Sequence, residues 1–174
     1  MPLIHNKISN YDYTDISKIF TYYAKNVIKP KYSKVKCFNY NIDSIPSENM
    51  RNKYDIIIST GAVSAGKHDF VPDSLRKLGA DILFHKVKIR PGKPVLYARF
   101  PDGTHYFGLP GNPVSAAVGL RFFVQPLLHH LQNMLAETPI TARLLMPYPK
   151  KNGLRVFYKA HVSVTYGGKL HMEV

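Results

Sequence analysis

The chain has little of what would mark a secreted or membrane-spanning protein. Its single cysteine, Cys37, cannot form an intramolecular disulfide. No apolar run reaches the roughly 18 residues of a transmembrane helix, and the N-terminal stretch MPLIHNKISN lacks the apolar segment of a secretory signal. These absences predict a cytoplasmic protein that does not bind a membrane.

Acidic residues are also scarce, because 11 Asp and Glu stand against 24 Lys and Arg, for a formal net charge of +13. Such a charge attracts anions of any kind, from nucleic acid to a small phosphorylated substrate. The basic residues occur as singles and pairs and not in blocks of five or more, so no nucleic-acid partner is expected. His129, His130, His161, His171 and Cys37 have no metal-ligand spacing to one another, which makes them surface or packing residues.

What the chain does contain is an alternation of helix-like and strand-like segments. Residues 1–53 are weakly patterned, with an amphipathic helix predicted over 15–25, a short strand over 35–39 and a loop or polar helix over 41–52. The segment 54–135 is predicted to hold a strand at 55–59 buried on both faces, a helix at 71–79, strands at 81–84 and 86–89, a hairpin of 94–100 with 104–109, and a helix at 114–131 kinked or restarted at Pro126. This order indicates an α/β layer fold whose ligand loops gather at the carboxyl ends of strands.

The chain changes character after Ala136. Residues 138–174 read as short alternating strands with turns at 151–153 and 167–168. We therefore expect a second, β-rich unit there, of which the 37 residues form only a part.

The first candidate site is the segment YDIIISTGAVSAGKHD at 54–69, where a strand runs into a glycine-bearing loop. Glycines let the backbone approach a phosphate closely, and hydroxyls add donors. The candidate residues are Ser59, Thr60, Gly61, Ser64 and Gly66. Asp69 could ligate a hard cation such as Mg²⁺, accept a proton, or cap the next helix. An ordinary turn is the alternative, since neither a Walker loop nor a dinucleotide-binding spacing is present.

The second candidate is KVKIRPGKP at 86–94, which holds Lys86, Arg90 and Lys93 around a Pro-Gly turn. Strand alternation would place Lys86, Lys88 and Arg90 on one face, where only a polyanion or solvent relieves their repulsion. A solvated edge strand is the competing interpretation.

The third candidate is YFGLPGNPVS at 106–115, where two prolines stiffen a strand-to-helix loop and aim the N–H groups of Gly111 and Asn112. Rigidity lowers the ordering cost of binding, although a purely structural turn is also possible. The residues expected to bind here are Pro110, Gly111, Asn112, Pro113 and Ser115.

In order and spacing, these three segments resemble the molybdopterin molybdenumtransferase family, which includes the bacterial MoeA enzymes and the gephyrin E domain. The resemblance covers about residues 54–133, and 138–174 look like the start of the family's C-terminal β-domain. It implies a three-layer molybdopterin-binding α/β domain with a mostly parallel sheet. The implied reaction inserts molybdenum from molybdate into adenylylated molybdopterin, with Mg²⁺ involved, and releases AMP.

The resemblance also implies roles for the candidate residues. Thr60, Gly61, Ser64 and Gly66 would line the pterin phosphate or nucleotide site, and Asp69 would be the acidic residue of the metal or molybdate region. Lys86, Arg90 and Lys93 would hold oxyanions, with residues 110–115 as the pocket wall. A homodimer and other molybdenum cofactor synthesis proteins are the implied partners.

The sequence departs from the family before Tyr54, because residues 1–53 show neither its Thr-Gly-Asp/Ser-Glu loop nor its Asp-x-Asn segment. We therefore expect a truncated member. Two alternatives stay open: a molybdopterin adenylyltransferase, which should lack the β-rich unit, and a non-catalytic molybdopterin-binding or scaffold protein.

Overall fold

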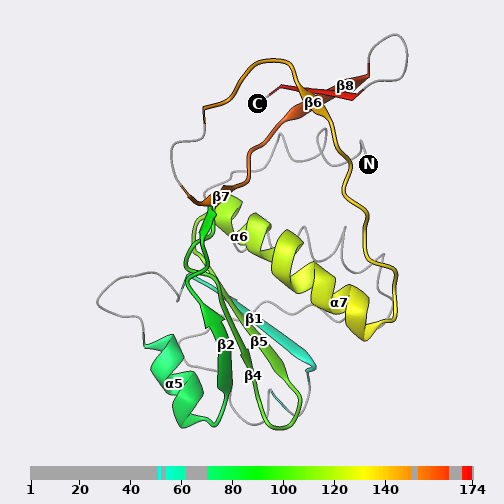
Figure 1. Cartoon of the computed structure of the whole chain (residues 1–174). Coiled ribbons are helices and arrows are strands. Elements are labelled where there is room, and N and C mark those ends of the chain that lie inside the picture. Colours follow the sequence, from blue (N-terminus) through cyan, green and yellow to red (C-terminus); the bar gives the residue numbers. More distant parts are fainter. Residues whose placement is uncertain (1–50, 52–53, 62–69, 150–152, 165–169, 174) are drawn as a thin grey trace.

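The structure is a computed structural model that describes residues 51, 54–61, 70–149, 153–164 and 170–173. A four-stranded sheet with helices on both faces forms its centre (Figure 1). The sheet contains β1 (Ile56–Thr60), β2 (Asp81–His85), β4 (Leu96–Arg99) and β5 (His105–Leu109). The helices are α5 (Val71–Lys77), α6 (Pro113–Gly119), the π-helix η2 (Leu120–Val124) and α7 (Gln125–Leu131). The elements predicted within residues 1–50 lie outside the described residues.

The strand order is β1-β5-β4-β2, with β5 parallel to β1 and antiparallel to β4, and with β4 antiparallel to β2. The predicted hairpin of β4 and β5 is confirmed, and its turn is closed by the hydrogen bond from the Phe100 N–H to the Thr104 carbonyl, at 2.9 Å. The α/β class is likewise confirmed. Among the described strands, however, the sheet is mixed and not mostly parallel, because so short a turn can join only antiparallel neighbours.

Two apolar clusters occupy the two faces of the sheet and make the predicted three layers. Between the sheet and α5 lie Ile57, Val71, Leu75, Ala80, Leu96, Ala98, Phe100 and Tyr106. Between the sheet and the α6–α7 run lie Val95, Phe107, Leu109, Ala116, Leu120, Val124 and Leu128. Because Ile57 belongs to one cluster while Ile56 and Ile58 pack against the other, β1 is covered on both faces, as its apolar sequence predicts.

The predicted helix at 114–131 is present as the continuous run α6, η2 and α7. Its start is set by Asn112, whose side-chain oxygen accepts hydrogen bonds from the N–H groups of Val114 and Ser115. The expected effect of Pro126 takes the form of a π-helical turn, in which the Gln125 N–H bonds the Leu120 carbonyl five residues back. Pro126 has no N–H to offer, so the wider turn falls where the α-helical bonding is interrupted. None of the helices in the described ranges combines the length and apolarity of a bilayer crossing.

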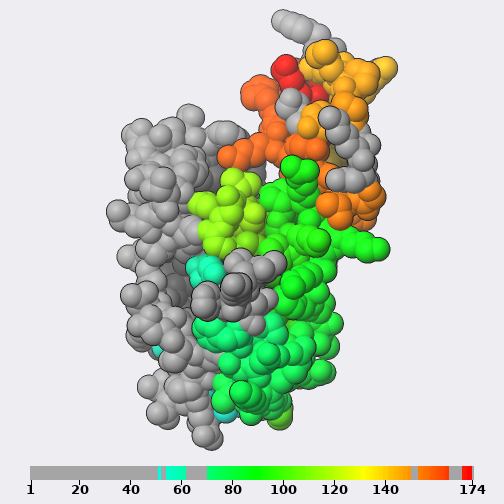
Figure 2. All heavy atoms as spheres, turned by 90° about the vertical axis from the view of Figure 1, so that its left-hand side faces the viewer, coloured from blue at the N-terminus to red at the C-terminus, as the bar shows by residue number. Residues whose placement is uncertain are grey.

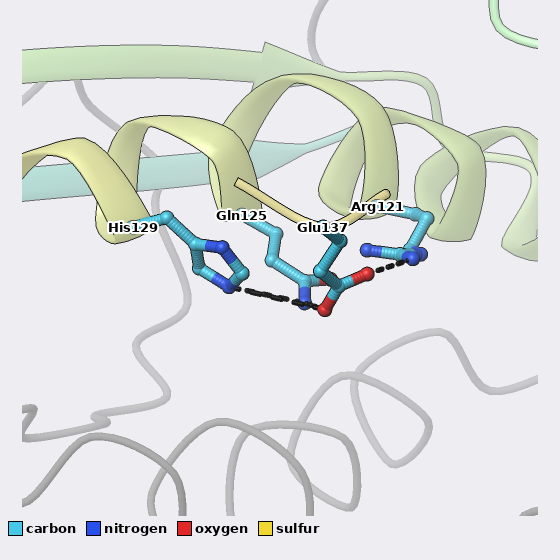
Figure 3. Close-up of polar contacts among 4 residues, drawn as sticks. All are labelled: Arg121, Gln125, His129 and Glu137. Carbon is cyan, nitrogen blue, oxygen red and sulfur yellow. Dashed lines mark hydrogen bonds and ion pairs between the residues drawn. The ribbon is translucent and has the colours of Figure 1, made fainter. Parts of the chain in front are cut away.

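The chain after α7 folds back along this helix and is held there by Glu137 (Figure 3). One carboxylate oxygen pairs with Arg121, and the other accepts a hydrogen bond from the Gln125 amide at 3.0 Å. The same oxygen lies 4.0 Å from the Nε2 atom of the buried His129. His129 is thus a packing residue, which was one of the two roles predicted for it.

The C-terminal strands are β6 (Arg143–Leu144), β7 (Arg155–Val156), β8 (His161–Val164) and β9 (Leu170–Glu173). Three of them form a small sheet in the order β6-β9-β8, which agrees with the predicted β-rich unit. β7 pairs instead with β3 (Ile89–Arg90), in parallel. The predicted turns at 151–153 and 167–168 fall largely outside the described residues. This pairing places β7 next to the start of α6, while β6 and β8 lie further away (Figure 1).

Candidate functional site

The first and third candidate segments meet where β1 and β5 end. Thr60 and Leu109 are register partners, and the Gly61 N–H donates to the Leu109 carbonyl at 3.1 Å. Gly61 has φ +87, a conformation that favours glycine. A Cβ atom at Gly111 would lie 3.2 Å from the Gly61 Cα, so the two backbones are as close as they are because Gly111 has no side chain.

The second segment lies against the third through its Pro-Gly turn. Gly92 has φ +104, and a Cβ atom there would lie 3.5 Å from the Ser115 carbonyl oxygen and 3.6 Å from Val118 Cγ1. The turn is closed by the hydrogen bond from the Val95 N–H to the Gly92 carbonyl, at 3.1 Å. The turn therefore packs on the first residues of α6.

Residues 60–61, 90–93 and 110–115 thus gather at one end of the sheet, and we call their surface the three-loop face. Figure 2 shows the cyan end of β1 and the lime start of α6 on one side of the molecule, with green residues beside them and the orange C-terminal part above. Of the remaining candidates, Ser64, Gly66 and Asp69 lie outside the described residues. The structure therefore brings together the parts of all three segments that it describes.

The cationic side chains Lys86, Arg90 and Lys93 are all exposed. The strand predicted over 86–89 is wrong, because β3 has only two residues and Lys86 has φ +64. The chain turns there: the Lys86 N–H bonds the Val95 carbonyl at 3.1 Å, and the Ile89 N–H bonds the Val87 carbonyl at 2.9 Å. Simple strand alternation therefore does not set the positions of Lys86 and Arg90, although both are solvent-facing while Ile89 is buried.

The loop at 110–115 is built differently from the prediction. Asn112 uses its side-chain oxygen for the N–H groups of Val114 and Ser115, at 3.1 and 3.2 Å, so those donors are already occupied. Pro110 and Ser115 are buried and form the support of the loop, whereas Gly111, Asn112 and Pro113 reach the surface. The Gly111 and Asn112 N–H groups have no hydrogen-bond partner within the described residues. Among the described residues, these two N–H groups are therefore the unoccupied donors of the loop.

Ser59 does not offer its hydroxyl to a ligand, contrary to prediction. It lies in the core, where its Oγ is 2.6 Å from the Tyr106 hydroxyl. Burial raises the pKa of Tyr106, and the hydrogen bond with Ser59 opposes this rise. The signal was present in the sequence, because alternation along β1 puts Ser59 on the same face as Ile57.

β7 and the residue after it border this face, although no pattern in the sequence predicts that they do. The Arg155 N–H bonds the Lys88 carbonyl at 3.0 Å, and the Phe157 N–H bonds the Arg90 carbonyl at 2.8 Å. The next residue, Tyr158, contacts Tyr148 with ring centroids 4.6 Å apart. Strand pairing between residues so far apart in the chain leaves no local pattern from which to find it.

The metal prediction rests on Asp69, outside the described residues. Within the ranges that the structure covers, no three His, Cys, Asp or Glu side chains lie where they could hold a metal ion. The described part of the three-loop face thus offers cations, N–H groups and the Thr60 hydroxyl but no carboxylate set. It is suited to an anion, and it does not by itself fit Mg²⁺.

Residues 42–130 of the chain match the family model described as "Probable molybdopterin binding domain". The chain is 41% identical over 109 residues to the molybdopterin molybdenumtransferase of Synechococcus elongatus, which is 62% of this chain and 27% of that protein. It is 42% identical over 114 residues to the protein of the same name in Bacillus subtilis, which is 63% of this chain and 26% of that protein. The match thus spans about a quarter of the length of these relatives.

Among solved structures, the molybdopterin biosynthesis moeA protein of Pyrococcus horikoshii is 25% identical, with a TM-score of 0.48. That likeness covers 72% of this chain and 27% of the other.

Proposed function

This chain belongs to the family of probable molybdopterin binding domains, and on that premise we propose that it acts in molybdenum insertion, late in molybdenum cofactor biosynthesis. In the proposed reaction it binds adenylylated molybdopterin and molybdate, the metal enters the pterin dithiolene, and AMP leaves. The chain's likeness to two molybdopterin molybdenumtransferases, at 41% and 42% identity, supports this choice.

The observation that carries the proposal is the gathering of the three segments. Residues 60–61 touch 110–111 through Gly61 and Gly111, while 90–93 pack on Ser115 through Gly92. The exposed cations Arg90 and Lys93 and the two N–H groups of Gly111 and Asn112 therefore belong to segments that meet at one surface. Molybdate is a dianion and the pterin carries phosphates, so fixed donors and cations at short range are what such ligands require.

We assign roles on this basis. Arg90, Lys93 and Lys86 hold the oxyanions, and the Arg90 guanidinium can donate hydrogen bonds to two oxygens at once. Thr60 and Gly61 line the phosphate side, together with Ser64 and Gly66, and residues 110–115 form the wall. Asp69 remains the proposed acidic residue of the metal or molybdate region. No step is assigned to Mg²⁺, because the described residues do not supply its ligands.

The C-terminal strands bear on the competing functions. A stand-alone molybdopterin adenylyltransferase should lack a β-rich unit after residue 138, whereas β6, β8 and β9 form one here. This favours molybdenum insertion over adenylylation. A homodimer, contacts with other molybdenum cofactor synthesis proteins and a cytoplasmic location belong to the same proposal.

The deciding experiment is complementation of a bacterial strain that lacks its molybdenumtransferase, read as the activity of a molybdoenzyme. We expect the chain to restore activity and Arg90→Ala with Lys93→Ala to abolish the rescue. Arg76→Ala with Lys77→Ala is the matched control, since it removes two exposed cations from α5, away from the three-loop face. Failure to rescue while the folded chain still binds AMP and molybdate would point to the scaffold function instead.

Direct binding measured by calorimetry separates these outcomes further. The chain should bind molybdate and AMP, and Asp69→Ala or Arg90→Ala should weaken that binding at least tenfold. A folded chain that binds neither ligand would overturn the proposal. ATP-dependent adenylylation of molybdopterin by this chain would show that it is a molybdopterin adenylyltransferase instead.

A further inference from the structure

Tyr148 and Tyr158 form an aromatic pair that the assigned roles do not use. Their ring centroids are 4.6 Å apart, with the planes tilted by 57°. The two residues are 45% and 50% exposed, respectively. An aromatic pair that served only to pack the C-terminal strands would be expected to bury more of its rings, because burial is what aromatic side chains contribute to a core.

The pairing of β7 with β3 fixes this pair beside Arg90. The Phe157 N–H binds the Arg90 carbonyl at 2.8 Å. The Phe157 ring stacks on Phe122 of the helix run, with centroids 4.1 Å apart and planes at 26°. Phe157 thus anchors its strand to the helical layer, and Tyr158 follows it directly, next to the residue that contributes the guanidinium of the three-loop face.

The electrostatics of Tyr158 agree with this proximity. Its pKa is raised, first by the hydrogen bond with Tyr148, while the positive charge of Arg90 opposes the rise. Arg90 is therefore a charged neighbour of Tyr158, as the backbone hydrogen bond between Phe157 and Arg90 requires.

Exposed aromatic rings next to a cation are the usual means of holding a nucleotide or another phosphorylated heterocycle. Stacking of one base on an aromatic side chain contributes about 1–3 kcal/mol, and it needs no particular hydrogen-bonding pattern on the base. The cation binds the phosphate and the ring binds the heterocycle, so together they select a ligand that carries both.

We propose that Tyr148 and Tyr158 form a stacking subsite for the planar heterocycle of a ligand whose phosphate is bound by Arg90 and Lys93. This rests on the proposed function, in which the ligand is adenylylated molybdopterin. Both of its ends, adenine and pterin, have the required chemistry. The subsite adds discrimination between ligands with and without a ring, beyond the anion binding of the three-loop face.

The test compares ligands that differ only in the ring, using the full chain and calorimetry. AMP should bind about 5- to 150-fold more tightly than ribose 5-phosphate, which is the 1–3 kcal/mol of one stacked base. Tyr158→Ala and Tyr148→Ala should lower the affinity for AMP to that for ribose 5-phosphate. The affinity for ribose 5-phosphate itself should not change. Tyr158→Phe should keep the wild-type preference. Neopterin, measured in the same way, shows whether the pair takes the pterin ring instead of adenine.

A second measurement remains valid if the alanine variants do not fold. The chain contains no tryptophan, so Tyr158→Trp introduces a single tryptophan whose selectively excited fluorescence a stacked ring should quench. Leu135→Trp is the control, because residue 135 is 92% exposed and lies beyond α7. Quenching at position 158 alone supports the subsite.

The outcomes that overturn the subsite differ from those that overturn the function. If ribose 5-phosphate binds as tightly as AMP and neopterin does not bind, the subsite is absent while the anion site stands. Equal AMP binding by wild type and Tyr158→Ala likewise excludes the subsite and leaves the anion site. If the folded wild-type chain binds no AMP, ribose 5-phosphate or molybdate, the proposed function fails and takes the subsite with it.

Discussion

The sheet layers and the C-terminal strands are stabilised in different ways. Every residue of β5 is buried, whereas every residue of β8 is exposed. The layers are held by two apolar clusters, and the C-terminal strands by backbone hydrogen bonds, the Phe122–Phe157 contact and the tyrosine pair. The layers therefore determine stability, and substitutions in the C-terminal strands are expected to act mainly on ligand binding.

The largest expected effect lies in the layers. Leu109, the last residue of β5, is fully buried between the sheet and the helix run. Leu109→Ala should therefore lower the free energy of unfolding by about 2–5 kcal/mol. Val164→Ala in β8, where the residue is 68% exposed, should change it by no more than about 0.5 kcal/mol. Urea unfolding of both variants measures the contrast, and equal losses would contradict the view that the layers alone determine stability.

A smaller loss is expected from the buried polar contact in the layers. Ser59→Ala leaves the Tyr106 hydroxyl without its partner and should cost about 1–3 kcal/mol. Tyr106→Phe in addition should cost less than the sum of the two single changes, because no hydroxyl is then left unpaired. A double-mutant cycle by urea unfolding gives the coupling; additive losses would mean that the hydrogen bond contributes nothing.

Two glycines test the division between binding and stability. Gly111→Ala places a methyl group 3.2 Å from the Gly61 Cα and should cost about 1 kcal/mol, with weaker molybdate binding as the loops move apart. Gly153→Ala is matched to it in the C-terminal part, where a Cβ atom would meet nothing within 4 Å. Thermal unfolding and calorimetry on both variants should show a change at Gly111 alone. Unchanged molybdate affinity in Gly111→Ala would show that the close approach of Gly111 to Gly61 does not contribute to molybdate binding.

The smallest effect is a dependence of stability on pH that comes from the layers. Burial lowers the pKa of His105, Arg99 adds to this, and Asp55 opposes it. The Tyr97 hydroxyl lies 2.8 Å from the Nδ1 atom of His105. The unfolded chain therefore binds a proton at this histidine more readily than the folded chain does. The contribution of His105 to the free energy of unfolding is complete above the ordinary histidine pKa of about 6.5, and it is lost as the pH falls below that value.

Urea midpoints between pH 8 and 5.5 measure this slope. His105→Gln should flatten it, whereas His161→Gln in the exposed β8 should leave it unchanged. An unchanged slope in His105→Gln would mean that other titratable groups cause the pH dependence of the free energy of unfolding.

The sequence predicted the layers better than it predicted the site. The apolar run of β1, the Pro-Asp-Gly turn between β4 and β5, and the Asn112-Pro113 helix start are local signals, and each is confirmed. The left-handed conformation of Lys86 is not marked by a glycine, and the pairing of β3 with β7 joins residues distant in the chain. No local pattern contains them, so the position of Tyr158 beside Arg90 could not be found from spacing.

The parallel pairing of β3 with β7 also constrains the order in which the molecule assembles. β7 can pair only after the intervening chain, with its hairpin and its long helix run, has brought Arg155 back to Lys88, and the entropy of closing so long a loop must be overcome first. Contacts of this kind slow folding, because they stabilise the chain only once the local structure exists. The tyrosine pair should therefore take up its place beside Arg90 after the sheet and helices have formed.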